Sequence, residues 1–335
     1  MSDSVVVTGA AGFVGAHVVR ALVHAGRRVV ATDLAPALPA AVLHGLDAGR
    51  ATYVPGDLRD AATQAALVEA GGASADVVHP AALLRFAEMA RVLGEGAPTP
   101  AEALEVFEVN ALATWQLVTA FTDAGTLGRF VYVSTRSVYG GLQTDRPTIL
   151  ESDPQTPLGL YGSSKTAAEV GVLALREAFG LDLAVARITG VFGPWQTATS
   201  FIAKAVEAVS AGEAYRIEAG GADEYEFTYA KDTAGGLLAV LDAPKLEQAI
   251  YHISSGSMHS LHEVGDAFRK ADASAVVEFG PGGAGGRRRK PLDGEQAARE
   301  LGFRPAWGLD DAIADYLQVQ RTGNYGPEVV APTGR

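Results

Sequence analysis

The chain has 335 residues, of which 48% are hydrophobic and 20% charged, and its 27 basic and 39 acidic side chains give a net charge of −12. The length predicts one large α/β domain or a domain with an extension. The composition is typical of a globular protein and excludes an intrinsically disordered chain. The acidic balance argues against a nucleic-acid partner. Because the sequence has no cysteine, disulfides, thiolate nucleophiles and cysteine-based metal sites are excluded. We name no metal-ligating residues.

The apolar segments are too short for a membrane protein. No apolar run reaches the roughly 18 residues that a membrane helix needs. The N-terminal apolar stretch is interrupted by glycines and Arg20, and it lacks a basic leader. We therefore predict no membrane segment and no signal peptide, and a cytoplasmic location.

Short β-rich runs alternate with helical patterns over the first two-thirds of the chain. Apolar strands that alternate with amphipathic helices are typical of a parallel sheet covered by helices on both faces. The sequence therefore predicts an α/β fold with a Rossmann-type doubly wound sheet. The expected strands are 4–8, 28–32, 52–54, 76–79, 130–134 and 183–187, and the expected helices are 13–24, 61–70, 101–123 and 163–179.

The pattern becomes less regular after Gly190, where we expect a smaller α+β region at the carboxyl edge of the main sheet. We assign residues 1–188 to the sheet domain, 189–322 mainly to a substrate-binding region, and 323–335 to a surface tail. In this second part the expected strands are 215–218, 226–229, 250–253 and 276–279, and the expected helices are 200–210, 232–242 and 261–270.

A glycine-rich loop joins the first strand to the first helix. Gly9 permits a tight turn, Gly12 lets the backbone approach a pyrophosphate, and Gly15 lets the helix pack closely on the strand. Free N–H groups at the helix start favour phosphates. Asp33 ends the second strand, where its carboxylate would bind both adenosine-ribose hydroxyls and repel a 2′-phosphate, which favours NAD over NADP. The residues that we expect to contact NAD here are Gly9, Gly12, Phe13, Val14, Gly15 and Asp33.

Tyr161 and Lys165 lie four residues apart, on one face of an expected helix. A free tyrosine titrates near pH 10, which is too high for a base at neutrality. A neighbouring ammonium and a cationic nicotinamide ring would lower the pKa of Tyr161 toward neutrality. Hydroxyl residues at 134–137 end a predicted central strand, where doubly wound folds bind ligands.

These motifs resemble those of the extended short-chain dehydrogenase/reductases, in particular the NAD-dependent epimerase/dehydratase family, over nearly the whole chain. The resemblance implies a catalytic triad of Thr135, Tyr161 and Lys165. It also implies pairing into a homodimer through the helices around 101–123 and 163–179. Further cofactor contacts implied by the resemblance are Asp57 and Leu58 at the adenine, Ala81 and Ala82 beside the cofactor, and Asn110 on its helix.

The chain departs from the family pattern at positions that concern the substrate. Arg136 and Ser137 stand where dehydratases of the family carry an Asp-Glu pair, so we expect no dehydration. Gly190 replaces an asparagine, and Tyr225 an arginine, that would hold a sugar diphosphate, and Glu224 and Glu226 would repel one. The residues that we expect at the substrate are Arg85, Arg136, Ser137, Gly190, Trp195 and Tyr225, although packing accounts equally well for Trp195.

The sequence therefore favours an NAD-dependent oxidoreductase acting at a secondary alcohol or ketone of a sugar, sugar acid or related polyol. The first alternative is a sugar or nucleotide-sugar epimerase with the same triad. The second is a non-catalytic NAD-binding sensor, against which the intact triad argues. The substrate and the direction of the reaction stay open.

Overall fold

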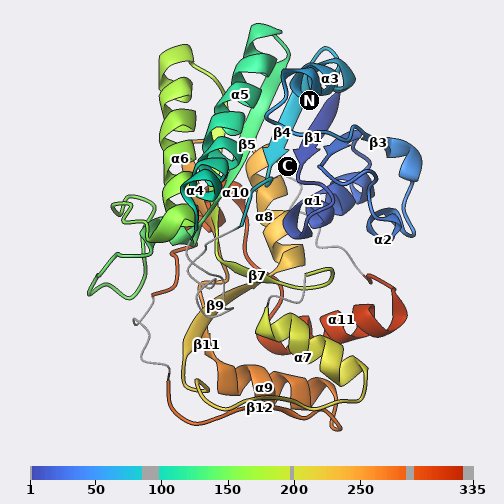
Figure 1. Ribbon diagram of the computed structural model, residues 1–335, viewed down its shortest axis with the longest axis vertical. Helices are drawn as coiled ribbons and strands as arrows, with labels where there is room; N and C mark the ends of the chain where they lie inside the picture. Colours follow the sequence, from blue (N-terminus) through green and yellow to red (C-terminus); the bar gives the residue numbers. More distant parts are fainter. Residues whose placement is uncertain (1, 85–97, 197–199, 284–289, 327–335) are drawn as a thin grey trace.

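The computed structural model describes residues 2–84, 98–196, 200–283 and 290–326, and a seven-stranded parallel sheet forms its centre (Figure 1). This confirms the predicted Rossmann-type fold. The strand order is β10-β6-β5-β4-β1-β2-β3, with the chain reversing direction across the sheet between β1 and β4. The strands are β1 (Ser4–Thr8), β2 (Val29–Thr32), β3 (Ala51–Tyr53), β4 (Ala75–His79), β5 (Leu127–Thr135), β6 (Leu183–Ile188) and β10 (Ile250–Ile253).

Alternate residues of each strand supply the two apolar cores. In β1, Val5 and Val7 join the core beneath α1 (Phe13–His24) and α8 (Ala230–Asp242), whereas Val6 joins the core beneath the helices of the opposite face. Both faces of the sheet are therefore covered. The opposite layer contains α3 (Ala61–Gly71), α5 (Ala113–Asp123) and α6 (Gly159–Phe179). The helix α4 (Pro100–Phe107) lies before α5 in the chain.

A smaller region lies against the carboxyl edge of the large sheet (Figure 1). Its three-stranded sheet has the order β11-β9-β7, and a two-stranded sheet pairs β12 with β8. A separate apolar core lies between these strands and three helices. The elements are β7 (Gly190–Phe192), α7 (Phe201–Ser210), β8 (Tyr215–Ile217), β9 (Glu224–Tyr229), β11 (Met258–Ser260), α9 (Leu261–Ala271), β12 (Val277–Phe279) and α11 (Leu309–Thr322).

The boundary that the sequence predicts at residue 188 separates the two regions only in part. The chain returns to the large sheet with α8 and β10, and β10 pairs in parallel with β6 as an edge strand. The predicted surface tail is wrong at Tyr325, which is only 4% exposed. The sequence did not predict β7, β11 or α11, nor the short elements α2 (Ala40–Leu43), η1 (Ala48–Arg50), η3 (Arg136–Tyr139) and α10 (Glu295–Leu301).

The expected helix over 101–123 is interrupted in the middle. Its centre, Glu108–Leu112, forms a π-helical turn (η2) between α4 and α5. Such turns widen a helix locally and often occur at functional sites. Within the described residues, no helix is both long and apolar enough to cross a membrane.

Candidate active site

The glycine loop after β1 has the close contacts that its sequence predicts. Gly9 has a φ of +57°, and a Cβ there would lie 2.8 Å from Cα of Ala81. A Cβ on Gly15 would lie 2.0 Å from the Gly9 carbonyl oxygen, so a side chain at either position is excluded. The loop opens directly into α1, whose first N–H groups have no partner within the helix. This cradle fits a dinucleotide pyrophosphate.

Asp33 lies beside this loop. Its carboxylate accepts hydrogen bonds from the backbone N–H groups of Ala11 (3.1 Å) and Ala35 (3.2 Å). The Gly56 N–H donates to the Asp33 carbonyl oxygen (3.0 Å), which brings the segment with Asp57 and Leu58 alongside. The Asp57 carboxylate binds Arg59, and this contact lowers its pKa. The carboxylate of Asp33 is half-buried at the end of β2, as a ribose contact requires.

The segment after β4 is held by side-chain hydrogen bonds. His79 bridges Thr8 (Nδ1 to Oγ1, 2.7 Å) and Thr114 (Nε2 to Oγ1, 2.9 Å), and burial lowers its pKa to about 3. Asn110, in the π-helical turn, accepts from the Leu83 N–H (2.7 Å) and donates to the Leu83 carbonyl (3.1 Å). These contacts give His79 and Asn110 architectural roles and hold Ala81 beside Gly9.

Thr135, Tyr161 and Lys165 come together where β5 ends and α6 begins. Thr135 is the last residue of β5, and its side chain hydrogen-bonds the hydroxyl of Tyr161. A Cβ on Gly162 would lie 2.8 Å from the Ser137 carbonyl oxygen, so this glycine lets α6 approach η3 closely. The Lys165 ammonium lies 4.3 Å from the ring centre of Tyr132 and is 1% exposed.

The sequence predicts a lowered pKa for Tyr161, but the protein without bound NAD does not lower it. Burial raises the pKa of Tyr161 to about 12, and the hydrogen bond with Thr135 opposes this rise. Burial also lowers the pKa of Lys165 to about 7, with Glu169 acting in the opposite direction. Lys165 is therefore only partly charged near neutrality, and it stabilises the phenolate less than a full cation would.

Arg136 and Ser137 follow Thr135 in η3. The Arg136 guanidinium lies 3.6 Å from the Glu226 carboxylate and donates to the Lys290 carbonyl (3.0 Å). Glu226 is 2% exposed and also accepts hydrogen bonds from Ser254 and from the backbone of Gly256 and Leu292. The expectation that Glu226 would face a diphosphate is therefore wrong, because its charge is buried and paired with Arg136.

Gly190 and Tyr225 share one face of the small sheet. Gly190 in β7 pairs with Phe227 in β9, two residues beyond Tyr225, and side chains two apart in a strand point the same way. Gly190 follows the end of β6 closely, where Ile188 pairs with Thr135. The Tyr225 ring lies against Phe227 (5.7 Å) and Phe201 (5.6 Å). Gly190 and Tyr225, which depart from the family pattern, therefore lie near each other on one face of this sheet. This face lies close to Thr135 of the triad, because Ile188 is only two residues before Gly190.

Two other expected substrate residues have different outcomes. Trp195 stacks on Tyr325, with ring centres 4.9 Å apart, and it lies 4.8 Å from the ring of His17. These contacts describe the packing role that the sequence left open for Trp195. Arg85 lies outside the described residues.

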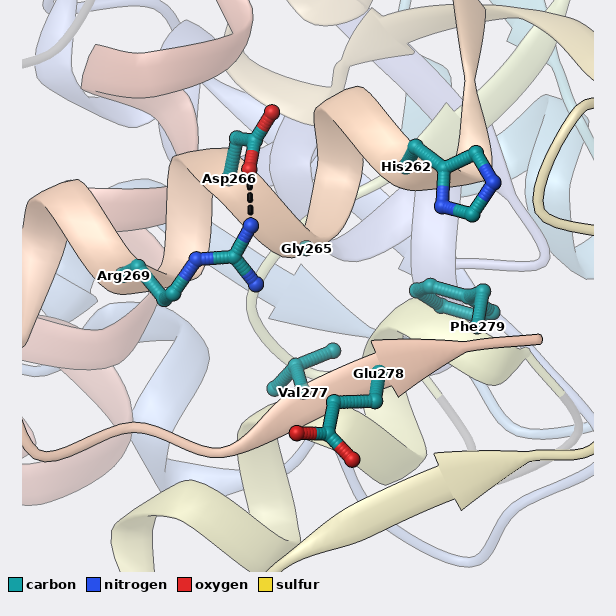
Figure 2. A pocket seen from close by; sticks show the side chains of 7 residues that line it. All are labelled: His262, Gly265, Asp266, Arg269, Val277, Glu278 and Phe279. Atoms are coloured by element: carbon teal, nitrogen blue, oxygen red, sulfur yellow. Dashed lines mark hydrogen bonds and ion pairs between the residues drawn. The ribbon is translucent and has the colours of Figure 1, made fainter. Parts of the chain in front are cut away.

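Two cavities of about 250 and 270 Å³ lie in the smaller region. The first, between α9 and β12, is lined by His262, Arg269 and Glu278 among others (Figure 2). The second is bordered by Phe192, Phe227 and the loop that contains Trp307. Neither cavity contains a triad residue. No cluster of three or more His, Asp or Glu residues suited to a metal ion occurs within the described ranges.

Glu169 and Ser164 are two residues of this site that the sequence did not predict. Glu169 is fully buried one turn beyond Lys165, and its carboxylate binds Arg187. Ser164 accepts a hydrogen bond from the Asn110 amide (2.9 Å), which joins α6 to the π-helical turn. The four-residue spacing from Lys165 to Glu169 was the available signal, because it puts both side chains on the same helix face.

The parallel sheet, the glycine loop with Asp33 and the Tyr–Lys pair define an NAD-dependent enzyme of the extended short-chain dehydrogenase/reductase type. More narrowly, the chain belongs to the NAD dependent epimerase/dehydratase family, whose model matches residues 5–254. This confirms the resemblance seen in the sequence, and NAD is the cofactor.

Three relatives illustrate the similarity. The chain is 31% identical to a dTDP-glucose 4,6-dehydratase of Streptomyces griseus, covering 94% of this chain and 93% of that one. It is 27% identical to a UDP-glucose 4-epimerase of Mycolicibacterium smegmatis, covering 94% and 97%. Among solved structures, MoeE5 in complex with UDP-glucuronic acid and NAD is 30% identical, covers 95% of this chain and 99% of its own, and has a TM-score of 0.76.

Proposed function

We propose that this enzyme transfers hydride between NAD and a secondary alcohol or ketone of a sugar, sugar acid or related polyol. The observation that carries the proposal is the hydrogen bond between Thr135 and Tyr161, with Lys165 buried one turn further along α6. This arrangement provides a base, a group that orients the reacting oxygen and a cation in one place.

In this mechanism Tyr161 takes the proton of the substrate hydroxyl, and Thr135 orients the substrate oxygen by a hydrogen bond. The ammonium of Lys165 stabilises the phenolate and holds ribose hydroxyls of the cofactor. When bound, NAD supplies the hydride acceptor and a cationic ring. Because burial holds the pKa of Tyr161 at about 12 in the protein alone, we expect both cations to be needed before Tyr161 acts as a base.

The residues around Thr135 support an oxidoreductase more than a dehydratase. Water elimination needs a general acid and a general base beside the sugar ring. Here Arg136 is paired with Glu226, and the hydroxyl of Ser137 accepts from Thr135 (3.4 Å). Neither residue supplies a carboxyl group at this position.

A nucleotide-sugar epimerase is the second candidate. The similarity to a UDP-glucose 4-epimerase and to a complex with UDP-glucuronic acid favours it. An epimerase uses the same proton and hydride transfer twice, and the triad suits either reaction. Gly190 and Tyr225 argue against it, because both positions lack the amide and guanidinium that would bind a diphosphate.

The direct test is turnover with a panel of sugars, sugar acids and nucleotide sugars. A dehydrogenase would exchange added NAD and form NADH, whereas an epimerase would retain NAD through purification and convert substrate with no net NADH. Tyr161→Phe should bind NAD as the unaltered protein does and lose turnover by about 10²–10⁴-fold, because only the proton-transfer oxygen is removed. Near-normal activity of this variant would overturn the assignment of the base.

We also propose a homodimer that forms through α4, α5 and α6, which lie together in Figure 1. Three large apolar side chains are exposed here: Leu104 in α4 (59%), Leu112 in the π-helical turn η2 (46%) and Val170 in α6 (59%). Sedimentation analysis of the protein and of Val170→Lys would test this arrangement, with loss of a dimer expected for the variant. A carbohydrate-like substrate without a nucleic-acid partner, and a cytoplasmic location, stay predictions from the sequence.

A further inference from the structure

Glu169 is a buried carboxylate directly behind the triad. It lies four residues beyond Lys165 and eight beyond Tyr161, so all three side chains share one face of α6. Its side chain has no exposure to solvent. A buried carboxylate is costly unless its charge is paired and its oxygens accept hydrogen bonds.

Both carboxylate oxygens of Glu169 have such partners. The Nε of Arg187 lies 3.1 Å from each oxygen, and Nη2 of Arg187 lies 2.6 Å from Oε2. The Ser134 hydroxyl donates to Oε1, and the side-chain amide of Gln155 donates to Oε2. The carboxylate is thus held by β5, by β6 and by the segment before α6, which fixes its place closely.

This arrangement connects the two parts of the triad. Ser134 directly precedes Thr135 in β5 and pairs in register with Arg187 in β6. One carboxylate therefore ties the helix that carries Tyr161 and Lys165 to the strand that carries Thr135. We propose that Glu169 is a positioning residue of this enzyme, which locks α6 onto β5 and β6 and places a negative charge one helical turn from Lys165.

The charge balance around Lys165 supports this role. Glu169 raises the pKa of Lys165 against the lowering effect of burial, and His79 is neutral there because its own pKa is about 3. Without the carboxylate, Lys165 and Arg187 would be two buried cations with no anion between them. The groups that face Lys165 are Glu169 on α6, Tyr132 on β5 and His79 on β4, and Tyr161 lies one helical turn before it in α6. The groups that face Glu169 are Lys165, Ser134, Gln155, Arg187, Tyr132 and Tyr139.

The inference rests on the proposed role of Tyr161 as the base, and its test needs no turnover. Protein labelled with [13Cε]lysine is titrated by NMR with saturating NAD, and the Lys165 resonance is assigned from Lys165→Met. In Glu169→Gln we expect the pKa of Lys165 to fall by about one unit, because the favourable charge is lost. Glu177→Gln, the same change at an exposed position of α6, is the control and should leave this pKa unchanged.

A second variant keeps the test decisive if Glu169→Gln does not fold. Arg187→Gln removes the guanidinium that pairs with Glu169 and leaves the carboxylate in place. The carboxylate then interacts more strongly with Lys165, so the pKa of Lys165 should rise by about half a unit. NAD binding measured by calorimetry reports whether each variant is folded. A Lys165 titration that matches the control in any folded variant would overturn the proposal. Retained activity of Tyr161→Phe would instead overturn the proposed base and leave the titration result unaffected.

Discussion

Tyr325 stacks on Trp195 with ring centres 4.9 Å apart and an angle of 20° between the ring planes, although α7 to α11 separate the two residues in the chain. The guanidinium of Arg20 and the ammonium of Lys231 lie 4.3 and 4.4 Å from the centre of the Tyr325 ring. The Tyr325 hydroxyl also hydrogen-bonds His17 of α1. The end of the described chain thus fastens the smaller region to the helix of the glycine loop.

The first prediction concerns this contact. Tyr325→Ala should lower the free energy of unfolding by about 3–4 kcal/mol, because a buried ring and two cation–π contacts are lost. Tyr325→Phe is the matched control. It keeps the ring and loses the hydroxyl bond to His17, for about 1 kcal/mol. Urea denaturation followed by tryptophan fluorescence measures both, and an alanine variant as stable as the phenylalanine variant would contradict the packing role.

The second prediction is loss of stability in acid. Burial lowers the pKa values of His17, His79 and His252 to about 3 each, whereas an unfolded histidine titrates near 6.5. A histidine held neutral in the folded state contributes its full stability above pH 6.5 and loses it as the pH falls, because the unfolded chain then binds the extra proton. At pH 5 the loss is about 2 kcal/mol for each histidine.

Denaturation curves at pH 7 and pH 5 test this prediction. His17→Asn removes one of the three groups, so its stability should depend less steeply on pH than that of the unaltered protein. His24→Asn, at an exposed position near the end of α1, is the control and should leave the pH dependence unchanged. Equal stability of the unaltered protein at both pH values would contradict the neutral, buried state of these histidines.

The third prediction concerns the choice of cofactor. Asp33→Ala should reduce the preference for NAD over NADP, because the carboxylate supplies both the ribose hydrogen bonds and the repulsion of a 2′-phosphate. The same carboxylate accepts from the Ala11 N–H in the glycine loop, so we also expect weaker NAD binding. Calorimetric titration with each cofactor gives both affinities. Asp33→Asn separates the two effects, since it removes the charge and keeps an acceptor. Equal binding of NAD and NADP by the unaltered protein would contradict this role of Asp33.

The parts of the site that lie close together in the sequence were predictable. Strand β1, the glycine loop, α1 and Asp33 form one continuous unit, and its glycines have the predicted close contacts. The spacing of Tyr161 and Lys165 likewise placed both on one face of α6. Local patterns were sufficient here, because helix periodicity and turn geometry depend on neighbouring residues.

Features that depend on distant contacts were not predictable in the same way. The run 250–253 was correctly expected as a strand, but its pairing with β6 depends on where the chain returns after α8. Tyr325 follows Gly323 in a segment whose composition is typical of an exposed tail. The burial of Glu226 depends on Arg136, which lies far away in the sequence. Each of these outcomes is decided by tertiary packing, which local composition does not report.

The fourth prediction tests the substrate class at Gly190 and Tyr225. If these positions no longer bind a diphosphate, the unaltered protein should bind UDP weakly. Restoring the family residues in Gly190→Asn/Tyr225→Arg should then raise the affinity for UDP. Added charge-assisted hydrogen bonds give a gain of about 2–4 kcal/mol at best, which is roughly 30- to 1,000-fold in affinity.

The local structure indicates what each substitution costs. A Cβ on Gly190 would lie 3.0 Å from the Glu226 carbonyl oxygen, so the asparagine needs a shift of a few tenths of an ångström. An arginine at 225 loses the ring contacts with Phe201 and Phe227, and Glu224 lies next to it in β9. Because Glu226 is paired with Arg136, only Glu224 of the two carboxylates opposes the bound anion.

Calorimetric titration of UDP into both proteins is the measurement, and Tyr225→Lys with Gly190→Asn is a useful comparison. Lysine supplies the charge without the two-pronged geometry of a guanidinium, so it should give a smaller gain. Tight binding of UDP by the unaltered protein would defeat the proposal of a substrate without a nucleotide, and the nucleotide-sugar epimerase would then become the leading function. If the arginine variant gains no affinity for UDP, Gly190 and Tyr225 are not the positions at which a diphosphate would bind.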